Sequence, residues 1–93
     1  MRNSKKIEDV KTKVSDAFEL PKEIMLDLPK ISVIGNIHIL VENHRGIIEY
    51  NPERIRINSS IGVIRVDGAD MNLRNIASDD IIITGHIGKI EYL

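Results

Sequence analysis

The sequence predicts a mainly β protein: a compact antiparallel β-sandwich or meander of about seven short strands, preceded by an amphipathic helix. Three observations support this fold class. Of the 18 isoleucines, 16 lie at or after Ile31, and β-branched residues are enriched in strands. Apolar residues follow a helical period before residue 30 and alternate with period two after it. The clusters between the alternating runs are too short to hold crossover helices, so adjacent strands should run antiparallel.

Residues 1–29 are expected to form an N-terminal helical segment and residues 30–93 a β domain. Between residues 3 and 18 the apolar side chains are spaced to form one stripe on a helix, which consists of Ile7, Val10, Val14, Ala17 and Phe18. Pro21 ends this pattern, because proline lacks the N–H that a continuing helix needs. The stripe must be buried, either against the sheet or against another chain.

The β domain contains alternating segments, for example Ile37, Ile39 and Val41 interleaved with His38 and Leu40. Six clusters of turn-forming residues divide it, at positions 35–36, 43–46, 51–54, 67–70, 77–80 and 85–86. At 42% hydrophobic, the 93 residues can form a single domain with its own core.

An internal repeat offers an alternative fold. The pattern Ile-Gly-x-Ile starts at Ile34, Ile61 and Ile87, with spacings of 27 and 26 residues. A repeat of this length could be one coil of a short β-solenoid. Two coils make a very small solenoid, so we rank it behind the meander.

Charge and composition exclude several classes of partner. The 13 basic and 14 acidic residues nearly cancel, so the chain lacks the field that attracts nucleic acid. A small nucleic-acid-binding β-barrel is kept only as a minor alternative, with Tyr50 near Arg54 and Arg56 as its one candidate platform. Acidic residues among the N-terminal lysines limit membrane contact to a peripheral one. Charged residues also interrupt any signal-peptide core, so we expect a cytoplasmic protein.

No residue constellation predicts an enzyme, a cofactor or a metal site. The three histidines, His38, His44 and His86, lack the paired spacing of a zinc site, and the chain has no cysteine. A serine, histidine and aspartate could be selected from Ser59 or Ser60, His86 and Asp67, but no nucleophile elbow surrounds them. We therefore expect a protein without enzymatic activity.

The segment Glu42-Asn43-His44-Arg45-Gly46 lies between two isoleucine-rich runs. Asparagine and glycine tolerate positive φ, so we expect residues 43–46 to form the turn of a β-hairpin. Glu42 and Arg45 could form an ion pair across it. Because a turn needs neither histidine nor arginine, the segment could also contact a partner.

The order of residues in several segments resembles the YabP/YqfC family of sporulation proteins. The segments are Leu20-Pro21-Lys22, Leu28-Pro29-Lys30-Ile31, Ile34-Gly35-Asn36, Arg54-Ile55-Arg56-Ile57 and, above all, Glu42-Asn43-His44-Arg45-Gly46-Ile47. The resemblance runs from about residue 19 to the C-terminus. It implies a small non-enzymatic protein with a compact sandwich fold, made in the mother cell of an endospore-forming bacterium.

These observations lead to two functional hypotheses. The first is a structural or adaptor protein of sporulation, located in the mother-cell cytoplasm and recruited to the forespore surface by a sporulation or spore-envelope protein. Its candidate partner contacts are Ile7, Val10, Val14, Phe18, Asn43, His44 and Arg45. The second is a spore-envelope component that self-assembles into a homo-oligomer through strand edges.

Overall fold

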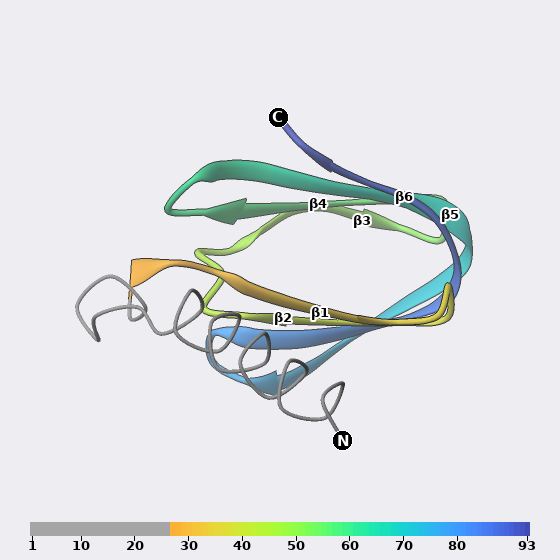
Figure 1. Ribbon diagram of the computed structural model, residues 1–93, viewed down its shortest axis with the longest axis horizontal. Helices are drawn as coiled ribbons and strands as arrows, with labels where there is room; N and C mark the ends of the chain where they lie inside the picture. The colour runs from red at the N-terminus through yellow and green to blue at the C-terminus, as the bar shows by residue number, and fades with distance from the viewer. Residues whose placement is uncertain (1–26) are drawn as a thin grey trace, which may run out of the picture.

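The computed structural model describes residues 27–93, and these form one antiparallel sheet of six strands (Figure 1). The strands are β1 (Lys30–Ile34), β2 (His38–Glu42), β3 (Ile47–Asn51), β4 (Arg54–Ser59), β5 (Gly62–Ala77) and β6 (Asp80–Tyr92). Their order in the sheet is β1-β2-β6-β5-β4-β3, and every neighbouring pair is antiparallel. The mainly β, antiparallel prediction is therefore confirmed.

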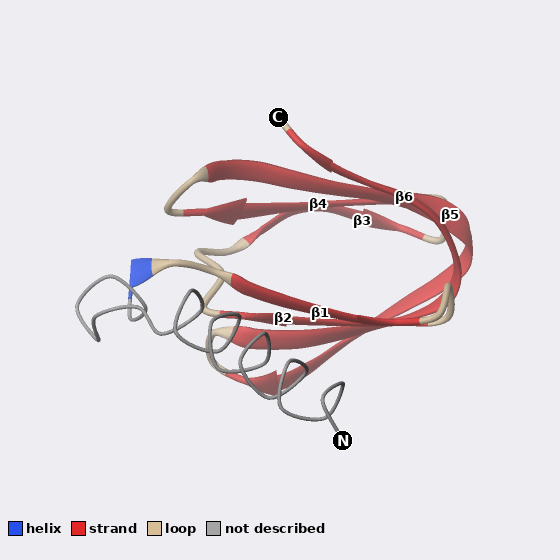
Figure 2. Cartoon of the chain, in the orientation of Figure 1, coloured by secondary structure: helices blue, strands red, loops and turns tan. Residues whose placement is uncertain are grey.

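The sheet is bent, so that its two halves face each other (Figure 1). One layer consists of β1, β2, the first part of β6 and the last part of β5. The other consists of β3, β4, the first part of β5 and the last part of β6. The long β5–β6 hairpin belongs to both layers, and Figure 2 shows that it passes round the bend as continuous strand.

Glycines and bulges produce the bend. The β5–β6 register shifts between Asp67 and Gly68 and again between Ala69 and Asn72, and such bulges sharpen strand curvature. A Cβ on Gly68 would lie 2.1 Å from the His86 carbonyl oxygen, and one on Gly85 would lie 2.6 Å from that of Asp70. The two strands therefore approach here more closely than any side chain allows.

Both layers contribute to a single core between them. The buried cluster contains Ile39 and Val41 from β2, Ile81 and Ile83 from β6, Ile55 and Ile57 from β4, and Val66 and Met71 from β5. β2, β4 and the first part of β6 alternate these residues with outward-facing ones, which is the period that the sequence predicted.

Three details of the prediction are wrong. The strands do not form a meander, because β2 pairs with β6 rather than with β3. The described residues form six strands rather than about seven, because positions 67–70 and 85–86 are bends within β5 and β6 and an unpredicted turn at Ser60 and Ile61 separates β4 from β5. The solenoid alternative is also wrong, since its coils would pair in parallel and all strand pairs here are antiparallel. The N-terminal helix expected within residues 1–29 falls almost entirely outside the described residues.

Candidate functional site

Residues 43–46 do not form a hairpin turn. β2 pairs with β1 and β6, whereas β3 pairs with β4 at the opposite edge of the sheet. The segment instead crosses from one layer to the other. Its backbone bonds to both layers, because the His44 N–H donates to the Asp79 carbonyl at 3.0 Å and the Arg45 N–H donates to that of Asn58 at 2.7 Å. Positive φ values at Asn43 and Gly46 allow this path.

The polar side chains of this crossover hold the start of the described chain. Asn43 has a φ of 64°, and its Nδ2 donates to the Leu28 carbonyl at 3.1 Å. The Arg45 guanidinium lies 2.9 Å from the Asp27 carboxylate. The expected ion pair between Glu42 and Arg45 is absent, since Glu42 lies instead 3.9 Å from the Lys30 ammonium. These contacts give Asn43 and Arg45 structural roles.

His44 is buried in the crossover, with 7% of its surface exposed. Its Nδ1 accepts a hydrogen bond of 2.9 Å from the Gly46 N–H, which places the proton of the neutral ring on Nε2. That Nε2 is buried and has no hydrogen-bond partner within residues 27–93. His44 therefore fills the crossover, with little of its surface exposed, and its contact with a partner stays a prediction. The other predicted contacts, Ile7, Val10, Val14 and Phe18, lie outside the described residues.

The outer face of the β3-β4-β5-β6 layer carries an ion-pair network. Two rows of side chains run across it in register, Glu49–Arg56–Arg65–Glu91 and Asn51–Arg54–Asp67–Lys89. We call these eight residues the ion-pair face. The N···O distances within it, five in all, range from 2.8 to 3.1 Å. Such a surface is well solvated and resists pairing with other chains.

The network lowers two carboxyl pKa values. Partial burial raises the pKa of Asp67, but hydrogen bonding from Arg54 and the charge of Arg65 outweigh it and hold that pKa below its ordinary value. A hydrogen bond from Lys89 lowers the pKa of Glu91, with a further contribution from the Arg65 charge. Both carboxyls are thus more stable as anions in the folded chain.

Replacing Asp67 with asparagine should flatten the acid limb of the stability profile. The pKa of Asp67 is lower in the folded chain than its ordinary value of 3.8. The ionised carboxylate therefore stabilises the fold above pH 3.8, and this stabilisation is lost as pH falls through the lower folded pKa. The pairs are partly exposed, so we expect a loss of only about 0.5–1 kcal/mol at neutral pH. Urea unfolding between pH 7 and pH 2.5 measures this. Asp79→Asn, in an exposed turn outside the rows, is the control, and equal profiles for the two variants would contradict the assignment.

The outer face of the layer that contains β1 and β2 carries different side chains, most of them uncharged. Its two registered rows are Ser32–Leu40–Ile82–Arg74 and Ile34–His38–Thr84–Asn72. We call these eight residues the pocket face. Leu40 and Ile82 are directly paired at its centre and are half-buried. Within the described chain, no ion pair joins members of these rows, so the face lacks the network of its counterpart.

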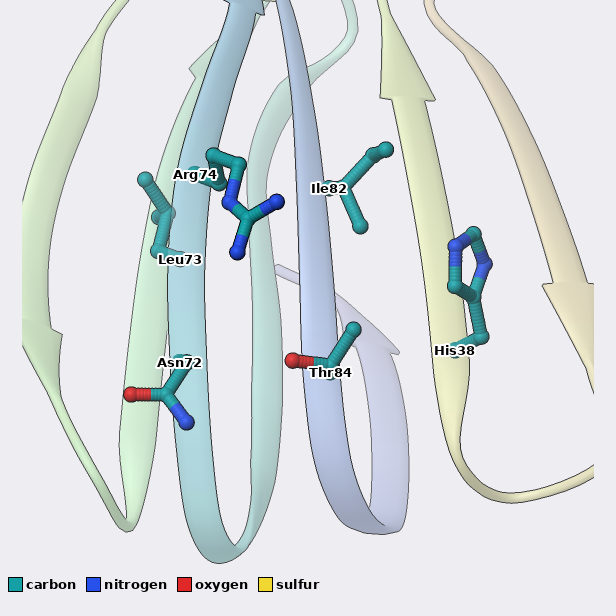
Figure 3. A pocket seen from close by; sticks show the side chains of 6 residues that line it. All are labelled: His38, Asn72, Leu73, Arg74, Ile82 and Thr84. Atoms are coloured by element: carbon teal, nitrogen blue, oxygen red, sulfur yellow. The ribbon is translucent and has the colours of Figure 1, made fainter.

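A shallow cavity of about 430 Å³ lies on this face. It is lined by His38 from β2, Ile82 and Thr84 from β6, and Asn72, Leu73 and Arg74 from β5, which lie side by side in Figure 3. The His38 Nδ1 is buried and has no hydrogen-bond partner among residues 27–93. This one ring atom is therefore shielded from water, whereas Asn72, Arg74 and Thr84 beside it are exposed.

The sequence did not predict the pocket face. Alternation assigned His38 and Leu40 to the outward side of a strand, but strand order was needed to place Ile82, Thr84 and Asn72 beside them. Within the described residues, no group of three histidines, aspartates or glutamates could hold a metal ion.

Comparisons with known proteins identify the family. The family model described as "YabP family" matches residues 27–93. Over 84 residues the chain is 30% identical to a protein of Bacillus subtilis (strain 168) named "Uncharacterized protein YqfC", which covers 90% of each chain. No solved structure gives a significant match. Across the described range 27–93, no helix is long and apolar enough to cross a membrane. With the family model covering the whole β domain and this relative spanning most of the sequence, the chain belongs to the YabP family.

Proposed function

We propose that this protein is a non-enzymatic structural or adaptor protein of endospore formation, acting through protein–protein contacts. It works in the cytoplasm of the mother cell and is recruited to the forespore surface by a sporulation or spore-envelope protein. Membership of the YabP family supports the assignment to sporulation, in line with the sequence resemblance described above.

Exposed apolar side chains at the sheet edges support the adaptor role. In the edge strand β1 and the turn after it, Val33, Ile34 and Ile37 are 47–63% exposed. In the opposite edge strand β3, Ile47, Ile48 and Tyr50 are 38–48% exposed. Apolar groups gathered at unpaired strand edges are typical of surfaces that bind other chains. This is the observation that carries the proposal.

The dispersal of reactive groups favours binding over catalysis. His38 lies on the pocket face, His44 lies in the crossover, and His86 lies on β6 at the bend. Ser59, which the sequence offered as a nucleophile, donates its hydroxyl to the Gly62 carbonyl at 2.8 Å within the β4–β5 turn. An acid–base pair near a nucleophile is therefore not assembled from these residues.

Deleting the gene in its endospore-forming host should lower the number of heat-resistant spores and leave vegetative growth unchanged. The wild-type chain should restore spore numbers, whereas Ile48→Asp should fail to do so because a charge is placed on the exposed edge of β3. Val63→Asp, an apolar-to-acid change at a half-buried position outside the sheet edges, is the matched control. Thermal melts must show that both variants fold. Normal spore numbers in the deletion strain would contradict the proposal.

Self-assembly is the second candidate, and the open sheet favours it. β1 and β3 each pair on one side only, so their free edges could join strands of further copies. Light scattering at tens of micromolar separates the candidates. A molecular mass equal to that of the monomer would argue against assembly, and a molecular mass that rises with protein concentration would favour it.

A further inference from the structure

We infer that the pocket face is the docking surface of the chain's own N-terminal segment, with Ile7, Val10, Val14 and Phe18 packed over the Leu40–Ile82 pair. This inference goes beyond the proposed function and does not depend on it. It assigns a specific occupant to one of the two outer faces.

The contrast between the two faces is the first observation. The ion-pair face is covered by salt bridges and needs no other cover. The pocket face instead places Leu40 and Ile82 at its centre and Ile34 at its rim. Its His38 Nδ1 is shielded from water without a polar partner among residues 27–93. An outer sheet face of this kind is normally packed against another element.

The second observation is where the chain enters. The Leu28 carbonyl accepts from Asn43, and the Asn43 N–H donates to the Asp80 carboxylate at 3.1 Å. Lys30, Glu42 and Asp80 form the registered row at this same end of the pocket face. The 26 residues that precede Asp27 therefore join the domain at the edge of this face.

The dimensions also match. As a helix, Ile7 to Phe18 would extend about 16 Å at 1.5 Å per residue. Together with the adjoining row of Lys30, Glu42 and Asp80, the pocket face measures about 14 Å along β2 and about 14 Å across its four strands. The eight residues 19–26 can span up to about 26 Å, which is enough for the helix to return over the sheet.

The chemistry of the segment fits the face. The stripe is apolar along one side, so it can cover Leu40 and Ile82 while its lysines and acids remain in water. A segment of the same chain is present at a high effective concentration, which favours it over a separate partner. The ion-pair face would then stay exposed, as its charges require.

Engineered cysteine pairs test this in the full chain, which has no native cysteine. Val14→Cys combined with Ile82→Cys should form an intrachain disulfide under mild oxidation. Asp16→Cys with Ile82→Cys is the control, because Asp16 lies on the opposite side of the predicted helix. Val14→Cys with Arg56→Cys places the second thiol on the ion-pair face. We expect the first pair to crosslink about tenfold faster than either control, because its thiols are held in proximity.

Non-reducing electrophoresis and mass spectrometry distinguish the outcomes. An intrachain crosslink confined to the first pair, or to the same pairing with Leu40→Cys in place of Ile82→Cys, supports the inference. Crosslinks between chains would overturn it in favour of a second copy as the occupant. Equal rates for all pairs, with melting curves showing a folded β domain, would overturn it as well.

Discussion

Gly85→Ala is expected to destabilise the fold by about 3 kcal/mol or more, by combining backbone strain with a steric clash. Gly85 has a φ of 137°, a conformation that residues with a Cβ rarely adopt. Its added methyl group would also lie 2.6 Å from the Asp70 carbonyl oxygen and 2.8 Å from the Met71 Cα. Both neighbours are backbone atoms of the adjacent strand, so relief requires β5 and β6 to separate at the bend.

Gly35→Ala is the matched control for this prediction. Gly35 also has a positive φ, at 52°, but a Cβ there would meet no atom within 4 Å. Its replacement should cost only about 1 kcal/mol, the strain of a left-handed residue. Urea unfolding of the two variants measures the difference. Equal losses would contradict the close approach of the strands at the bend.

Ile83→Ala should lower the free energy of unfolding by about 2–5 kcal/mol. Ile83 is fully buried and belongs to the cluster that joins the two layers. Removing three carbons leaves a cavity between β2 and β6 on one side and β4 and β5 on the other. Because both layers contribute to one core, the unfolding transition should remain a single cooperative step.

Ile37→Ala removes the same atoms from a different environment. Ile37 is 56% exposed in the turn between β1 and β2, and we expect its replacement to change stability by no more than about 0.5 kcal/mol. Thermal or urea unfolding compares the pair. A similar loss for both variants would mean that the core does not lie between the layers.

Most of the β architecture could be predicted because it depends on local patterns. The alternation placed Ile37, Ile39 and Val41 on one face; Ile39 and Val41 are in the core, whereas Ile37 is 56% exposed in the turn before β2. Ile55 and Ile57 on β4 and Ile81 and Ile83 on β6, which are 26 residues apart in the sequence, are also all in the core.

The errors in predicting the turns arise where the same residue types are compatible with two local structures. The Asp67–Asp70 and Gly85–His86 clusters contain the residues of turns, yet in this fold they supply bulges and close strand contacts within long strands. Conversely, the real turn between β4 and β5 falls at Ser60 and Ile61. The signal was present in Asn58-Ser59-Ser60-Ile61-Gly62, because asparagine, serine and glycine are turn-forming residues, but it was missed.

The crossover at residues 43–46 was misread for a related reason. Asparagine and glycine permit positive φ in many kinds of connection, and only strand order separates a hairpin turn from a crossover between layers. The pocket face depends on the same information, since Leu40 and Ile82 become neighbours through β2–β6 pairing across about 40 residues. Long-range register of this kind is not encoded in any single segment.

The packing of the N-terminal segment on the pocket face is tested most directly by nuclear magnetic resonance, because Phe18 is the only phenylalanine in the chain. With methyl-labelled isoleucine and leucine, nuclear Overhauser effects from the phenylalanine ring can be assigned to one residue without ambiguity. We expect contacts from this ring to the methyl groups of Leu40 or Ile82, and their loss in Phe18→Ser. A folded β domain whose phenylalanine ring shows no contact with either methyl group would contradict the packing.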